Sequence, residues 1–294
     1  MRIPFYKLHL GGNSFILIDT ENEKQLKLSE YPEFSKAICN KRYGVGASGC
    51  IFLDEQNNLR LFRPDGTEAS DFYDALFCAA RYAFDSGRMS KNSLGDYQIK
   101  FNTLKGEKIL KVISSREFEI SLGSPFSLTS GKIIDSESSS IMENIEIDEH
   151  KMKMAGIHIL SDVIVTSSKN MNSKPFFLLY TKLRELFKPQ KIYLTVCQAV
   201  TKETLCIRTI KRGENTSCAS AASALVSSVI SGISNTAAVC IFAQGNKSLF
   251  EQQNLLAKDT DNSKKITILW DTTKNSLRAI ASGGYLFEGY FEYQ

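Results

Sequence analysis

The sequence predicts an α/β (α+β) protein made of two similar domains, and three observations support this prediction. The chain has 294 residues, which is enough for two medium-sized domains with separate cores. Short segments with strand-like alternation dominate, and only a few segments have helical periodicity. Each half also contains one helix of small residues entered from a loop, at Arg63–Ala69 and at Lys211–Ser217.

The first of these helices is predicted at Ser70–Asp85, and Gly87 closes it. Its apolar side is formed by Leu76, Ala79, Ala80 and Ala83. Before it, Phe5–Leu10 and Phe15–Asp19 alternate as strands around the turn Gly11-Gly12-Asn13. The other elements expected in this half are a helix at Ser29–Lys41 capped by Ser29, a hairpin of Cys50–Leu53 and Leu59–Phe62 across Asp54–Asn58, and strands at Gln98–Asn102, Ile109–Ser114 and Phe118–Leu122.

A polar stretch at Ser124–Glu149 contains three consecutive serines and is the best linker candidate. It places the domain boundary between residues 123 and 124. The elements expected beyond it are a strand at Gly156–Thr166, a helix at Pro175–Phe187, strands at Ile192–Val200 and Leu205–Ile210, a helix at Ser217–Ser231, and further strands to the end.

The composition narrows the classes of function. A net charge of +4 spread along the chain offers no basic block for nucleic acid. The longest apolar run, Ala219–Ile230, is interrupted by serines and too short to span a bilayer, and the first residues do not resemble a signal peptide. The seven cysteines are scattered without metal-ligand spacing, which predicts reduced thiols in a cytoplasmic protein.

Six motifs, in order over nearly the whole chain, resemble the diaminopimelate epimerase family. They are the opening strand–turn–strand Phe5–Asp19, the segment Lys41–Gly49 with Ser48 where Asp is usual, Asp65–Ala69, Leu122-Gly123-Ser124-Pro125, Arg212-Gly213 followed by Cys218, and the closing segment Ser282–Gly289. The resemblance implies two domains, each a mixed sheet wrapped around a central helix. It also implies that the closing strand, 284–294, returns to complete domain 1–123, which leaves 124–283 as the second domain.

The resemblance further implies a cofactor-independent isomerase, an amino-acid epimerase or racemase that uses no metal. One thiolate removes the α-proton of the substrate and a thiol returns a proton from the opposite face, because inversion moves the proton across the Cα plane. Each cysteine lies at a helix start, where unpaired N–H groups favour a thiolate and hold the substrate carboxylate. The implied partner is an amino-acid-like small molecule, without nucleic acid or membrane, and a homodimer is compatible with it.

The first catalytic position departs from this pattern. Counted from Asp65-Gly66-Thr67, the first cysteine falls on Phe72, and the usual Gly-Asn-Gly becomes Tyr73-Asp74-Ala75. Phenylalanine cannot carry a proton, and Asp74 would oppose a substrate carboxylate. Cys78 matches a later, non-catalytic cysteine and is expected in the core.

The second catalytic position is kept. Cys218 matches the other cysteine, and the small Ala219 and Ser220 follow it. The usual Glu-Arg-Gly before it becomes Lys211-Arg212-Gly213, so a basic side chain replaces an acidic one. If the alignment holds, Phe72 and Cys218 face each other across an interdomain cleft.

The other candidate substrate contacts are Asn13, Arg63 and His158, alongside Lys211, Arg212, Ala219 and Ser220. Three of the candidate residues also have structural roles as alternatives. Asn13 can serve the turn between strands, and His158 can be a core histidine with a satisfied ring. Cys218 can be a structural thiol.

Three hypotheses for the function follow. The first is a working diaminopimelate epimerase of lysine and peptidoglycan synthesis. The second is an isomerase on another substrate, with Cys218 as a single base and Arg63 and Lys211 binding a more acidic compound. The third is a non-catalytic paralogue that binds a small ligand or has a structural role. The changes at Phe72 favour a diverged member of the family with altered or lost activity.

Overall fold

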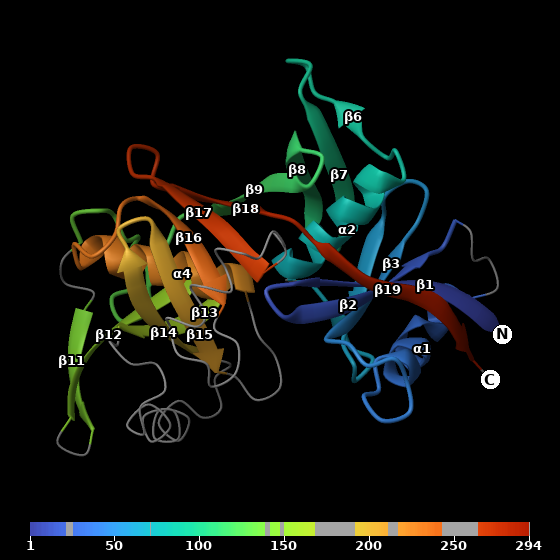
Figure 1. Ribbon diagram of the computed structural model, residues 1–294, viewed down its shortest axis with the longest axis horizontal. Coiled ribbons are helices and arrows are strands. Elements are labelled where there is room, and N and C mark those ends of the chain that lie inside the picture. The colour runs from blue at the N-terminus through green and yellow to red at the C-terminus, as the bar shows by residue number, and fades with distance from the viewer. Residues whose placement is uncertain are drawn as a thin grey trace. The chain divides into compact units, whose positions relative to one another are not determined.

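The computed structural model describes residues 1–21, 26–70, 72–138, 142–147, 150–167, 192–210, 217–242 and 264–293. Two compact units divide the chain: unit 1 is Met1–Ile120 with Ala281–Gln294, and unit 2 is Ser121–Ile280. Each unit combines a mixed sheet with one central helix, α2 (Tyr73–Asp85) in unit 1 and α4 (Ser217–Ile230) in unit 2 (Figure 1). The predicted fold class is confirmed.

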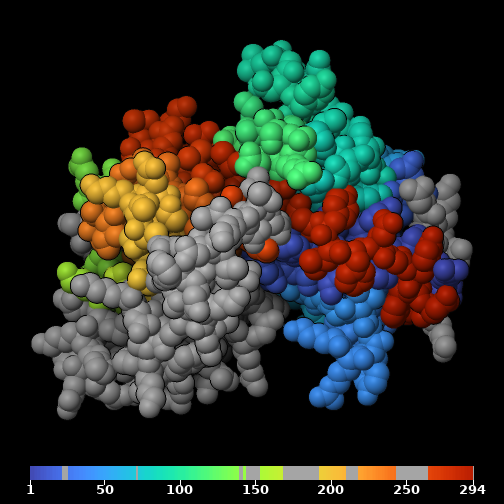
Figure 2. Space-filling model, in the orientation of Figure 1, coloured from blue at the N-terminus to red at the C-terminus, as the bar shows by residue number. Residues whose placement is uncertain are grey.

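A six-stranded sheet in the order β19-β1-β2-β3-β4-β5 forms one part of unit 1. Its strands are β1 (Arg2–Leu10), β2 (Asn13–Asp19), β3 (Gly49–Leu53), β4 (Leu59–Phe62), β5 (Glu68–Ala69) and β19 (Gly284–Glu292). The sheet is mixed because β2 and β3 pair in parallel, whereas the other neighbours are antiparallel. The last strand of the chain pairs with the first, and its mostly exposed residues lie in red at the surface of unit 1 in Figure 2.

The predicted hairpin across Asp54–Asn58 is present as β3 and β4. An antiparallel run of further strands follows α2 and comprises β6 (Ser90–Lys91), β7 (Tyr97–Thr103), β8 (Gly106–Ser114) and β9 (Glu117–Gly123). Ile99, Phe101, Leu110 and Phe118 form its buried face. These positions follow the strand alternation read from the sequence.

Helix α1 (Tyr31–Ile38) is shorter than the helix expected at Ser29–Lys41. Leu28–Glu30 forms a 3-10 turn, η1, so Ser29 does not cap the helix, and Pro32 occupies a first-turn position that suits proline. Tyr31 stacks on Phe52 with ring centroids 3.7 Å apart. The helix therefore packs aromatic side chains against one side of the sheet.

Helix α2 contacts β1, β2, β3 and β7. Its predicted apolar residues, including Leu76 and Ala79, are buried. The helix begins at Tyr73 rather than Ser70, and Glu68–Ala69 shortly before it is strand β5, which pairs with β4. Cys78 is fully buried, as expected, and burial raises its thiol pKa well above the ordinary value.

The closing segment passes very close to α2. A Cβ on Gly283 would lie 2.6 Å from the Cα of Cys78 and 2.9 Å from the carbonyl oxygen of Phe77. Backbone atoms cannot yield as a flexible side chain can, so this position requires glycine. The glycine pair at the end of the chain thus lets β19 enter the sheet across the helix.

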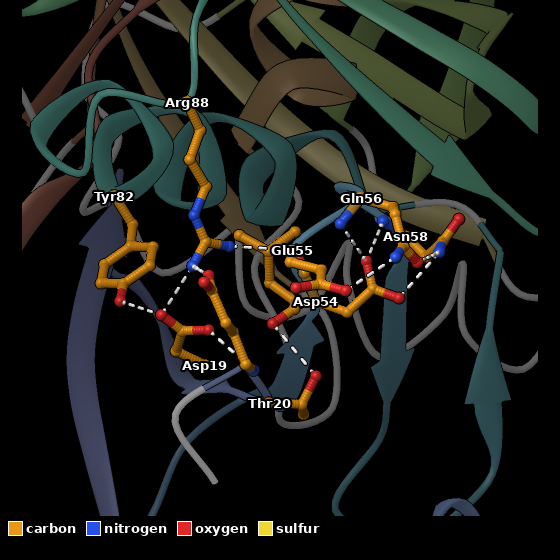
Figure 3. A network of polar contacts seen from close by, with 10 residues as sticks. Asp19, Thr20, Asp54, Glu55, Gln56, Asn58, Tyr82 and Arg88 are labelled. Atoms are coloured by element: carbon orange, nitrogen blue, oxygen red, sulfur yellow. Dashed lines mark hydrogen bonds and ion pairs between the residues drawn. The ribbon is translucent and has the colours of Figure 1, made fainter. Parts of the chain in front are cut away.

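A polar network fixes the far end of α2 (Figure 3). The guanidinium of Arg88 donates to the carboxylate of Asp19 at 2.7 Å, to Glu21 at 2.9 Å and to the carbonyl of Asp54 at 3.0 Å. The Tyr82 hydroxyl also donates to Asp19 at 2.7 Å. The side chains of Asp19 and Arg88 are only 6% and 12% exposed. The network therefore ties the end of α2 to the end of β2 and to the hairpin loop.

Unit 2 contains strands in the order β10-β12-β13-β14-β15-β16-β17-β18, and β11 pairs with β12. Their bounds are β10 (Phe126–Ser127), β11 (Met142–Ile147), β12 (His150–Ile159), β13 (Ser161–Ser167), β14 (Ile192–Thr201), β15 (Thr204–Ile210), β16 (Ala237–Phe242), β17 (Lys265–Asp271) and β18 (Ser276–Ala281). The strands β12 to β17 all contact α4. Within the described chain, no helix is both long and apolar enough to cross a membrane.

Two expectations for this unit were wrong. The single strand at Gly156–Thr166 is the hairpin β12–β13, which turns at Leu160 with a φ of 63°. The linker at Ser124–Glu149 contains β10 and β11, because both pair with β12. The helix expected at Pro175–Phe187 lies outside the described residues.

Candidate functional site

Phe72, the residue at which the family resemblance implies the first cysteine, is held on two sides by unit 1. Phe72 is the N-cap residue of α2, with φ −136° and ψ 79°, and gives the helix no side-chain cap. Its ring meets Phe15 of β2 edge-on, with centroids 6.2 Å apart. The guanidinium carbon of Arg63 lies 5.3 Å from the centroid of the same ring. Phe72 is therefore packed as a partly buried structural residue.

Arg63 is oriented by the turn that leads to α2. Its Nη1 donates to the Thr67 hydroxyl at 3.4 Å and to the carbonyl of Glu68 at 3.3 Å. Asp65 closes the turn by accepting from the backbone N–H and the hydroxyl of Thr67, and these bonds lower the pKa of the Asp65 carboxyl. Gly66 has a φ of +79°, which suits glycine in a turn. The Asp-Gly-Thr motif thus builds a tight turn that presents Arg63 to Phe72.

The next residue, Tyr73, is engaged by a lysine from β8. The ammonium of Lys108 lies 5.5 Å from the Tyr73 ring centroid and donates to its hydroxyl at 3.4 Å. A small pocket beside these rings is lined by Leu59, Leu61, Ala69, Ser70, Phe72, Tyr73, Ala75, Leu76, Thr103, Leu104 and Lys108. Its volume of about 20 Å³ has room for about one water molecule. This pocket does not accommodate an amino acid.

Asp74, the third changed residue, forms a buried polar chain with Asn13 and Ser48. The side-chain amide of Asn13 donates to the Asp74 carboxylate at 2.7 Å, and the Ser48 hydroxyl donates to the Asn13 carbonyl oxygen at 3.3 Å. Asn13 and Asp74 are 4% and 5% exposed. Asn13 closes the turn as the partner of Leu10 and begins β2, while Gly11 and Gly12, with φ of 59° and 94°, take the left-handed conformation in its place.

In unit 2, Cys218 is the second residue of α4 and is 2% exposed. Ala219 and Ser220 are also buried, as are all residues through Ser228. Lys211 and Arg212 lie outside the described residues. The expected opposition of Phe72 and Cys218 stays a prediction, because the two residues belong to different units.

His158 does not lie in the core. It is on the outward side of β12 with a side chain 49% exposed, and its Nδ1 is 2.6 Å from a carboxylate oxygen of Asp162. The neighbouring Ile157 and Ile159 are the buried residues of this strand segment. The core role was wrong because the strand alternation turns His158 outward, where Asp162 on β13 is its direct cross-strand neighbour.

The other thiols are structural in character. Burial raises the pKa of Cys39 to about 12 and that of Cys197 and Cys206 to about 11. None of the seven cysteines is in a disulfide. Among the described residues, no group of three or more His, Cys, Asp or Glu side chains is arranged to hold a metal ion.

Two residues of this site gave no signal in the sequence. Lys108 contacts Tyr73 from a strand 35 residues further along the chain, and Phe15 reaches Phe72 from β2. Only the pairing of strands brings these side chains to the start of α2. Ser48 departs from the family motif, and its contact with Asn13 has no signal in the sequence.

Solved structures of known proteins identify the class of fold. A phenazine biosynthesis protein of the PhzF family from Bacillus anthracis matches with a TM-score of 0.65 at 12% identity, over all of both chains. A probable proline racemase from Agrobacterium radiobacter K84 with bound carbonate matches with a TM-score of 0.59 at 7% identity, over 99% of this chain and 93% of that one. The chain therefore has the two-domain fold of PhzF proteins and proline racemases.

Curated sequences identify the relatives within that class. No protein-family model matches the chain. It is 26% identical over 244 residues to the diaminopimelate epimerase of Acetivibrio thermocellus, covering 78% of this chain and 84% of that protein. It is 25% identical over 281 residues to that of Desulforapulum autotrophicum, covering 88% and 95%. The chain is a distant homologue of the diaminopimelate epimerases over most of its length.

Proposed function

We propose that this chain is a diverged diaminopimelate-epimerase-like protein that has lost the two-base epimerisation of its relatives. The observation that carries the proposal is Phe72 at the N-cap of α2, because a phenylalanine side chain has no group that can donate or accept a proton. The packing supports a structural role for these positions, since Phe72, Tyr73 and Asp74 each contact other residues of unit 1. Loss of an acid–base group typically costs about two to four orders of magnitude in rate.

The direct test is the interconversion of LL- and meso-diaminopimelate by the purified chain. We expect no product above the uncatalysed background. We also expect Phe72→Cys to remain inactive, because Tyr73 and Asp74 still occupy the start of the helix and Asn13 remains bonded to Asp74. An active wild-type chain would overturn the proposal. Activity in Phe72→Cys alone would show that the missing thiol is the whole of the difference.

A second candidate function is a one-base isomerase that acts through Cys218. The observation in its favour is the position of Cys218 in the first turn of α4, followed by the small residues Ala219 and Ser220. Helix starts are where reactive thiolates occur, because the N–H groups and the helix dipole stabilise negative charge. Such an enzyme would act on an amino-acid-like molecule, and Arg63 and Lys211 would suit a more acidic one.

Alkylation at neutral pH followed by mass mapping compares Cys218 with the other thiols. The one-base function requires Cys218 to be labelled before Cys78, Cys197, Cys206 and Cys240. Those four thiols are buried, and burial raises the pKa of each. If Cys218 resists alkylation as they do, the non-catalytic, ligand-binding or structural alternative is favoured over the one-base enzyme.

The setting of the protein is part of the same proposal. Seven cysteines without a disulfide are consistent with a reducing, cytoplasmic compartment. The family chemistry needs no cofactor, so the proposal includes none. A role in lysine biosynthesis would require the working epimerase, which the residue at position 72 disfavours.

A further inference from the structure

The last strand of the chain, β19, is an edge of the sheet in unit 1. Among the described strands it pairs only with β1, so its other side is open to a further strand. Natural edge strands are usually short or carry lysine or proline, which discourage pairing with another chain. β19 has nine residues, Gly284–Glu292, and contains neither lysine nor proline.

Large apolar side chains are exposed along this edge, which lies at the surface in red in Figure 2. Tyr285, Leu286, Phe287 and Tyr290 are 39–62% exposed. A large aromatic side chain has about 150–250 Å² of surface, so the four together expose roughly 300–400 Å². An apolar patch of this size on one chain is often an interaction site.

The pairing with β1 determines which residues of β19 turn their backbone groups outward. The amine of Met1 donates to the carbonyl of Tyr293, and the N–H of Tyr293 donates back to the carbonyl of Met1. Tyr293 therefore turns toward β1, and the register continues without a shift as far as Phe287. Because this orientation alternates along an antiparallel strand, Glu288 and Tyr290 turn their N–H and C=O groups away from β1.

We propose that β19 pairs antiparallel with β19 of a second copy of this chain, about a twofold axis at Gly289, and so forms a homodimer. An axis at Glu288 would place two carboxylates opposite each other, and an axis at Tyr290 would place Glu288 opposite Glu292. Like charges directly opposite each other destabilise a sheet. The axis at Gly289 avoids both clashes and joins the outward-facing Glu288 and Tyr290 of the two copies.

The charges near the axis are complementary in this register. The guanidinium carbon of Arg2 lies 4.3 Å from the ring centroid of Tyr290. Glu288 of one copy faces Tyr290 of the other, so its carboxylate comes close to the Arg2 that covers that ring. The twofold axis produces this contact twice.

The apolar side chains are complementary as well. Phe287 and Phe291 project from the same face of β19 as Gly289, and the axis places Phe287 of each copy opposite Phe291 of the other. Gly289 has no side chain, which lets the two strands approach to about 4.5 Å between Cα atoms at the axis. The apolar area of two copies approaches the lower end of the about 1,200–2,000 Å² that stable complexes bury, so we expect a reversible dimer.

Sedimentation velocity over a concentration series tests for the dimer. We expect the wild-type chain to be dimeric at about 100 µM and to dissociate at about micromolar concentration. Glu288→Arg places a cation beside Arg2 of the other copy and should raise the dissociation constant at least about tenfold. The matched control is Glu55→Arg, the same change of charge at an exposed position of the β3–β4 loop. A monomeric wild-type chain, or equal shifts in the two variants, would overturn the proposal.

Disulfide cross-linking tests the register independently of the affinity. All seven native cysteines are buried, so an introduced thiol is read without competition from them. Glu288→Cys mixed with Tyr290→Cys should form a disulfide between copies under mild oxidation, because the two positions are about 5.5 Å apart between Cα atoms. Neither variant alone should do so, since its two copies of the thiol are offset by two residues along the strand. No disulfide in the mixture, or as much in Glu55→Cys alone, would contradict the proposed pairing.

Discussion

Replacing Phe72 by alanine should destabilise the start of α2 measurably, because its ring is held by Phe15 and Arg63. A buried Phe→Ala change costs about 3–5 kcal/mol, and half-burial reduces this to about 2. That sum includes an edge-to-face aromatic pair of about 0.5–1.5 kcal/mol and a cation–π contact of about 0.5–1. A residue without a structural role would not lower the free energy of unfolding by this amount when replaced by alanine.

Amide hydrogen exchange followed by mass spectrometry reads this change in α2 itself. A loss of about 2 kcal/mol corresponds to roughly a 30-fold increase in the exchange rate of amides that open with the helix. The control is Tyr43→Ala, since Tyr43 is 87% exposed and its removal should leave α2 unchanged. An exchange rate in Phe72→Ala within about threefold of wild type would refute the view that position 72 has become structural.

Three further predictions concern the support of the site. Arg88→Ala should lower the free energy of unfolding in urea by about 3 kcal/mol, because it leaves the buried Asp19 carboxylate without its ion pair. Arg81→Ala, at an exposed ion pair, should lower it by less than about 1 kcal/mol, and equal losses in the two variants would contradict this reasoning. Gly283→Ala should cost about 2–3 kcal/mol through backbone overlap, and Gly289→Ala, whose Cβ would meet only a ring, under about 1. Burial raises the pKa of the folded Cys39 thiol to about 12, so as pH rises this thiol ionises first in the unfolded chain. The free energy of unfolding should therefore fall above about pH 9, by about 1.4 kcal/mol per pH unit from this thiol. Cys39→Ala should make the fall of stability with pH less steep.

Residues whose role depends on local pattern could be predicted from the sequence. The spacing of Leu76, Ala79 and Ala83 identified the buried side of α2, and the turn residues of Asp54–Asn58 identified the hairpin of β3 and β4. Both signals are local because helical and strand periodicities depend on neighbouring residues alone.

Features set by distant pairing could not be predicted in the same way. The pairing of Glu68–Ala69 with β4, shortly before α2 begins at Tyr73, has no local signal, and the β12–β13 hairpin turns at Leu160, an apolar residue with no turn signal. The contact of Lys108 with Tyr73 likewise depends on tertiary packing. For the site, the family resemblance predicts a cysteine where this chain has Phe72, whereas the residues that contact Phe72 are visible only in the fold.

The central claim is that the chain cannot pass a proton across the Cα plane, and incubation with LL-diaminopimelate in deuterated water tests it directly. Mass spectrometry measures the deuterium incorporated at Cα, and chiral separation of the LL and meso forms measures how much substrate has been inverted. We predict no inversion. Deuterium incorporation with retained configuration that disappears in Cys218→Ala would support the one-base alternative. Deuterated meso product formed at ordinary enzymatic rates, on the order of 10 per second, would contradict the account.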